Sequence, residues 1–159
     1  MSLLFNNNSL IVPIFISFFL ILIQGFLPSL ILTDGLVVTC DLFLIYLTWL
    51  ALNKKLYQII VFAFFIGMFQ DLVIQPETVG LYSFIKVISV YFINYLKKVA
   101  SLWNELSKLL YLFIIYFSHY FLYHYVFINE FTSIFLVYIF LESVFNLIIF
   151  IIFDKIFFN

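Results

Sequence analysis

The chain has 159 residues, of which 67% are apolar and 9% are charged, and its formal net charge is −1. Soluble domains carry about 25% charged residues, so this composition excludes an ordinary soluble protein and indicates that a lipid bilayer is the solvent. The basic residues are seven scattered Lys, which excludes nucleic-acid binding through a basic patch. Cys40 is the only cysteine, so an intrachain disulfide is also excluded.

Six continuous apolar runs follow one another along the chain, and a helix of roughly 20 such residues crosses a bilayer. The runs are Leu10–Leu32, Leu36–Leu52, Leu56–Ile74, Val79–Leu96, Leu109–Phe127 and Phe131–Phe153. Their residues do not alternate between apolar and polar as in membrane β-barrels, so strands are not expected. The first run has no preceding Lys and no small-residue cleavage site, so we expect a retained helix. The sequence therefore predicts an all-α membrane protein, with residues 1–159 forming a single bundle of six transmembrane helices.

The segment 97–108, between the fourth and fifth runs, has a different pattern. Val99, Leu102, Trp103 and Leu106 recur at the spacing of one helical face, and polar residues flank them. This pattern predicts a short helix on the inner membrane surface, anchored by Trp103. A continuation of the fourth helix into the headgroups explains the same pattern equally well.

Six of the seven Lys residues follow the second, fourth and sixth runs. They are Lys54, Lys55, Lys97, Lys98, Lys108 and Lys155. The alternate loops contain Asp34, Glu77 and Glu130 and no Lys. Because positive residues favour the cytoplasmic side, six crossings with both termini in the cytoplasm are predicted.

Glu142 lies at the midpoint of the sixth run, where a carboxylate is most unfavourable. Tyr138 and Asn146 lie one turn before and one turn after it, so the three side chains form a polar stripe. The stripe is either a buried site or partner contact, or a hydrogen-bonded link within the bundle. We favour the link, because interhelical polar contacts commonly join membrane helices.

Three further charged residues lie in the outer halves of the predicted spans. Asp71 and Lys86 belong to runs joined by a loop of four residues, so we expect them to form an ion pair. Asp41 lies near the outer end of the second run. It either joins this cluster or reaches water, and its position favours water.

His119 and His124 are five residues apart, which places them about 140° apart on an ideal helix. This spacing favours separate hydrogen-bonded or interfacial histidines over a metal site. The sequence contains no Gly-rich phosphate loop, no Gly-x-Ser-x-Gly motif and no Cys pair. We therefore expect no catalytic centre, no metal and no cofactor.

The stretch 41–96, about a third of the chain, resembles the MreD family of rod shape-determining membrane proteins. Asp41 opens an apolar helix that ends in a short basic turn. Gly67-Met-Phe-Gln70-Asp71-Leu is similar to the family's Gly-x-x-Gln-Asp-Leu segment, and Gly80-Leu-Tyr-Ser is similar to the Gly-Leu-x-x segment that opens the next helix. The chain departs from the family by having Gln75-Pro76-Glu77 where a Gly-rich outer turn is usual, which puts the geometry of that loop in doubt.

The resemblance implies a fold similar to the substrate-binding subunits of energy-coupling-factor vitamin transporters. It implies a scaffold of the bacterial cell-wall elongation complex in the cytoplasmic membrane. The implied partners are an MreC-like protein and a RodA-type glycosyltransferase with its transpeptidase, and MreB filaments indirectly. The alternative is a transporter subunit that binds a ligand in an outer pocket lined by Asp41, Asp71 and Lys86. The first run lacks an Ala-x-x-x-Ala strip for docking a transporter subunit, which favours the scaffold.

Overall fold

The computed structural model describes residues 10–26, 30–33, 36–74, 76, 79–125 and 133–158. These residues form six α-helices and one short β-hairpin. In chain order the elements are α1 (Ile11–Gln24), β1 (Leu30–Thr33), β2 (Leu36–Val38), α2 (Leu42–Asn53), α3 (Leu56–Ile74), α4 (Leu81–Val99), α5 (Glu105–Tyr125) and α6 (Ser133–Phe158). The structure therefore shows a helical protein, as expected, with a hairpin that was not expected.

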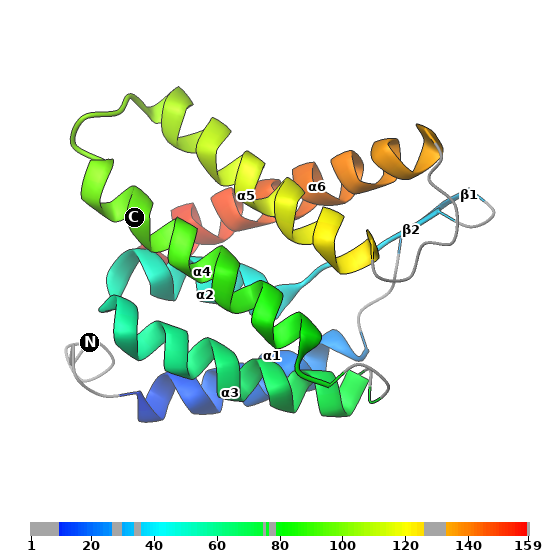
Figure 1. The fold of residues 1–159 in the computed structure, drawn as a ribbon, viewed down its shortest axis with the longest axis horizontal. Coiled ribbons are helices and arrows are strands. Elements are labelled where there is room, and N and C mark those ends of the chain that lie inside the picture. Colours follow the sequence, from blue (N-terminus) through cyan, green and yellow to red (C-terminus); the bar gives the residue numbers. More distant parts are fainter. Residues whose placement is uncertain are drawn as a thin grey trace.

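α4 and α5 slope in the same direction, and α6 crosses behind α5 at an angle (Figure 1). α3 packs against α4, α4 against α5, and α5 against α6. α2 is the central helix, because it contacts α1, α3, α4 and α6. Its residues from Phe43 to Ala51 are all buried. A helix that is apolar on all sides belongs in a protein core or against lipid, and the neighbouring helices give α2 the first of these environments.

Three helices are long and apolar enough to cross a membrane, namely α3, α5 and the stretch Ile134–Ile156 of α6. α1 and α2 are apolar but have 14 and 12 residues. At about 1.5 Å per residue both are shorter than the roughly 30 Å of hydrocarbon in a bilayer. The described residues thus contain three helices that are long and apolar enough to cross a membrane.

The hairpin corrects the predicted extents of the first two helices. β1 pairs with β2 in antiparallel fashion, with Leu30 opposite Val38. α1 ends at Gln24 with Gly25 as its C-cap, and the strand sequences contain β-branched residues, which favour extended backbone. Asp41 then begins α2, because its Oδ1 accepts a hydrogen bond of 2.9 Å from the backbone N–H of Leu44. The predicted helices over 30–32 and 36–40 are therefore wrong.

The separate surface helix predicted over 97–108 is also wrong. α4 continues to Val99, as in the alternative interpretation, and the chain then turns. Asn104 starts α5 by accepting a hydrogen bond of 2.8 Å from the backbone N–H of Ser107. Trp103 packs edge-on against Tyr111, with ring centroids 5.3 Å apart. The predicted acidic loop residues Asp34, Glu77 and Glu130 lie outside the described residues.

Candidate functional site

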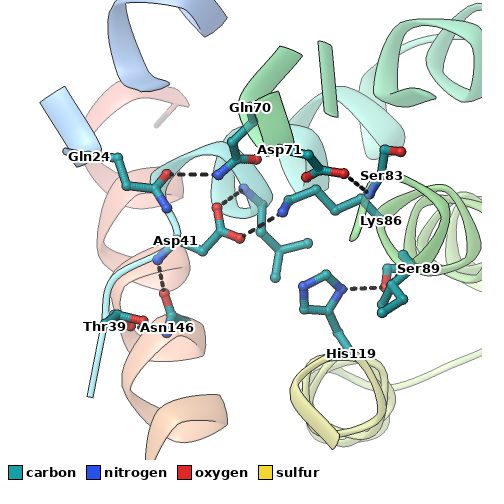
Figure 2. Close-up of polar contacts among 12 residues, drawn as sticks. Gln24, Thr39, Asp41, Gln70, Asp71, Ser83, Lys86, Ser89, His119 and Asn146 are labelled. Carbon is teal, nitrogen blue, oxygen red and sulfur yellow. Dashed lines mark hydrogen bonds and ion pairs between the residues drawn. The ribbon is translucent and has the colours of Figure 1, made fainter. Parts of the chain in front are cut away.

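A buried ion pair between Asp41 and Lys86 lies between α2 and α4 (Figure 2). Lys86 Nζ is 3.3 Å from Asp41 Oδ2, and the two side chains are 2% and 10% exposed. Asp41 therefore joins a buried pair within the bundle, and the expectation that it reaches bulk water at the outer end of its helix is wrong. The expected partner of Lys86 is also wrong, because Asp71 is not within ion-pair distance of it among the described contacts.

Asp71 instead holds the start of α4. Its Oδ2 accepts hydrogen bonds from the backbone N–H groups of Gly80, at 3.1 Å, and Ser83, at 3.0 Å. Gly80 has a φ of 94°, in the left-handed region that favours glycine. A carboxylate at this position satisfies N–H groups that a helix start leaves without intrahelical partners. The carboxylate of Asp71 is thus engaged by backbone rather than by Lys86.

Gly67 lets α3 and α4 approach each other closely one turn before Asp71. A Cβ atom added to Gly67 would lie 2.8 Å from the Cβ of Ser83, closer than real side chains pack. Gln70 lies on the same buried side of α3, and its Nε2 lies 3.4 Å from Gln24 Oε1 of α1. The segment from Gly67 to Asp71 therefore joins α3 to both α1 and α4.

Side chains of α6 form hydrogen bonds to the end of the hairpin and to the start of α2. Asn146 Oδ1 accepts a hydrogen bond from the backbone N–H of Asp41 at 2.9 Å, and its Nδ2 donates to the backbone carbonyl of Thr39 at 2.9 Å. Glu142 Oε1 accepts a hydrogen bond from the Thr39 hydroxyl at 2.8 Å. Glu142 Oε2 lies 2.7 Å from His124 Nε2 of α5. The polar stripe of α6 thus links three parts of the bundle.

The two histidines have separate partners, as their spacing suggested. His119 Nδ1 lies 3.0 Å from the Ser89 hydroxyl of α4, whereas His124 pairs with Glu142. Within the described ranges no group of three His, Cys, Asp or Glu side chains is arranged to hold a metal ion.

A small polar cavity of about 40 Å³ lies beside the ion pair and is partly open. Asp41, Asp71, Lys86, Gln70 and Tyr120 contribute to its lining. The structure therefore brings four of the sequence-predicted candidates, Asp41, Gln70, Asp71 and Lys86, around one cavity. Gly67 and Gly80 shape the helix contact behind it, and Glu142 lies apart, at the hairpin.

Sequence analysis missed Thr39, Ser83 and Ser89. Each is uncharged, and Ser83 lies at a variable position of the Gly-Leu-x-x segment, so no signal in a single sequence distinguishes these residues from other hydroxyl side chains. Thr39 in particular was assigned to a helix, although its hydroxyl and carbonyl form the contacts to α6.

The chain was compared with protein-family models, curated proteins and solved structures, and none of them matches it.

Proposed function

We propose that the protein is a non-enzymatic scaffold or regulatory subunit of the bacterial cell-wall elongation complex, which maintains rod shape. It lies in the cytoplasmic membrane as a six-span bundle with both termini in the cytoplasm. It contacts an MreC-like protein and a RodA-type glycosyltransferase with its transpeptidase, and it is linked indirectly to MreB filaments.

One observation supports this proposal above the others. The five residues that carry the resemblance to the MreD family all take part in one helix junction. Asp41 pairs with Lys86 and caps α2, Gly67 allows the contact of α3 with α4, Gln70 contacts α1, and Asp71 binds the backbone of Gly80. A scaffold subunit that catalyses no reaction needs its helices held in one arrangement. The contacts of these five residues hold the helices in that way.

The positions of the Lys residues support the proposed orientation. The α2–α3 junction, the α4–α5 junction and the last turns of α6 lie at the same end of the bundle (Figure 1). Lys97 Nζ lies 3.5 Å from the backbone carbonyl of Lys54, so two of these segments are in contact. Positive residues gathered at one end favour that end facing the cytoplasm.

The alternative is a substrate-binding subunit of an energy-coupling-factor type vitamin transporter. It is favoured by the cavity, because Asp41, Asp71 and Lys86 line it as that interpretation requires. The volume argues against it, since sites for drug-sized ligands measure about 300–1,000 Å³ and this cavity measures about 40 Å³. The scaffold is therefore the preferred function.

Depletion of the protein in its native cell, followed by microscopy and affinity capture from membranes, tests the proposal. We expect rounded cells, and co-capture of MreC-like and RodA-like proteins with the tagged chain. Re-expression of the wild type or of Lys108→Met, which alters an exposed ion pair, should restore shape. Lys86→Met, the same substitution at the buried pair, should restore it poorly. Unchanged cell shape with co-capture of an ATP-driven transporter module and loss of vitamin uptake would replace the scaffold by the transporter.

A further inference from the structure

Two buried polar atoms beside the Asp41–Lys86 pair lack a hydrogen-bond partner within the described part of the chain. They are Oε1 of Gln70 and the hydroxyl oxygen of Tyr120. The two residues are 5% and 3% exposed, and both line the cavity of about 40 Å³. A buried polar group without a partner loses its hydrogen bonds to water and gains none in return, so nearly all such groups in proteins are satisfied by protein atoms or by water.

Lys86 adds unused hydrogen-bonding capacity to the same cavity. An ammonium group has three N–H donors, and Asp41 is the acceptor recorded for it in the described residues. Their separation of 3.3 Å exceeds the roughly 2.7–2.9 Å of a strong charge-assisted hydrogen bond. The lining therefore presents donors, from Lys86, and an acceptor, from Gln70, to the same small space.

Size and charge together restrict what can occupy this space. A water molecule needs about 10–15 Å³, so about 40 Å³ has room for roughly three. The carboxylates of Asp41 and Asp71 disfavour an anion, and the ammonium of Lys86 disfavours a metal cation. A neutral guest that both donates and accepts hydrogen bonds fits the remaining requirements.

We propose that the cavity is a binding site for a cluster of roughly three water molecules that hydrates the Asp41–Lys86 pair inside the bundle. The waters accept hydrogen bonds from Lys86 and donate to Gln70, and Tyr120 completes the network. Removing two charges from water is strongly unfavourable, and bound water offsets part of that penalty. The inference does not depend on the proposed function, because it concerns only what fills the cavity.

Water-edited solid-state NMR of the full-length, isotope-labelled protein in phosphatidylethanolamine–phosphatidylglycerol bilayers tests this inference. The experiment measures how fast magnetisation passes from water to each side chain. We expect transfer to Lys86 and Gln70 to be several-fold faster than transfer to Thr48 and Tyr116. That pair is an internal dry control, because both residues are fully buried and their hydroxyl oxygens lie 2.9 Å apart.

A pair of matched variants makes the experiment decisive. Gln70→Leu removes an acceptor from the cavity and should reduce the transfer rate at Lys86 several-fold. Gln58→Leu makes the same substitution elsewhere on α3, away from the cavity lining, and should leave that rate unchanged. Transfer to Lys86 as slow as transfer to Thr48 would show a dry cavity and overturn the inference. Chemical shifts of Lys86 that saturate with added sodium or chloride would also overturn it, in favour of a bound ion.

Discussion

Removing one partner of the Asp41–Lys86 pair should strongly destabilise the protein. Nζ and Oδ2 are 3.3 Å apart in an environment where both side chains are almost fully buried. At an effective dielectric constant of about 20, the attraction across this distance is about 5 kcal/mol. Removing one partner of a buried pair costs about 3–5 kcal/mol, because the remaining charge is left uncompensated. We expect Lys86→Met and Asp41→Asn each to lower the free energy of unfolding by about this amount.

The double variant Lys86→Met/Asp41→Asn separates the ion pair from the other roles of Asp41. Asn is as good a helix N-cap as Asp, so the hydrogen bond from the N–H of Leu44 can be kept. The double variant buries no unpaired charge. We therefore expect it to recover about 2–3 kcal/mol relative to the sum of the two single losses, the upper range of measured coupling energies.

The measurement is equilibrium unfolding of the four proteins in the same mild detergent, together with their steady-state levels in membranes. Lys108→Met serves as the control, because its partner Glu105 is exposed and such pairs contribute about 0–1 kcal/mol. Combining Lys86→Met with Asp71→Asn should bring no recovery, since Asp71 binds backbone N–H groups instead. Strictly additive losses for Lys86→Met and Asp41→Asn would refute the assigned pairing.

Three other substitutions test the helix junctions by their effect on the thermal unfolding midpoint. Gly67→Ala should destabilise by about 1–3 kcal/mol through overlap with Ser83, and Ser83→Gly in the same chain should restore part of the loss. If Ser83→Gly restores none of the lost stability, overlap with Ser83 is not the cause of the loss. Gly80→Ala should cost about 1–2 kcal/mol through backbone strain alone, because its added Cβ meets no atom within 4 Å, and Gly80→Asn should cost less. Equal losses for Ala and Asn would contradict this cause. Glu142→Leu should cost about 1–3 kcal/mol by removing the partner of His124, whereas Glu142→Gln, which keeps an acceptor, should cost less. A stable Glu142→Leu variant would show that the contact is dispensable.

The helices were predicted most closely where an apolar run is bounded by polar residues. The bounds of α3, Leu56–Ile74, agree with the prediction at both ends. The hairpin was missed because its strands continue the apolar runs of α1 and α2, and a short apolar segment cannot be assigned to helix or strand by periodicity alone. Two residues in the sequence mark the true helix ends, namely Gly25 after α1 and the capping Asp41 before α2. The prediction gave more weight to the continuous hydropathy of the runs than to these residues.

The members of the candidate site were identified more successfully than their contacts. Asp41, Asp71 and Lys86 were found because a charge within an apolar run requires a partner. Lys86 was paired with Asp71 because a short loop joins their helices. The backbone N–H groups of Gly80 and Ser83 donate hydrogen bonds to the carboxylate of Asp71. The sequence does not show these bonds, because backbone donors are the same in every sequence. This is why Asp41, from a helix further away in the chain, is the partner.

The attachment of α6 to the hairpin has a consequence for how the protein is made. Asp41 bonds Asn146 across 105 positions of sequence, and Thr39 bonds Glu142 across 103. At about 5–20 residues per second, a ribosome needs roughly 5–20 s to synthesise the intervening chain. During that time the earlier helices are already being inserted. The groups of Thr39 and Asp41 that bond to α6 cannot yet form these hydrogen bonds, because Glu142 and Asn146 have not been synthesised. α6 emerges after the other described helices and completes these contacts, so a nascent chain that stops before α6 would be a target for membrane proteases.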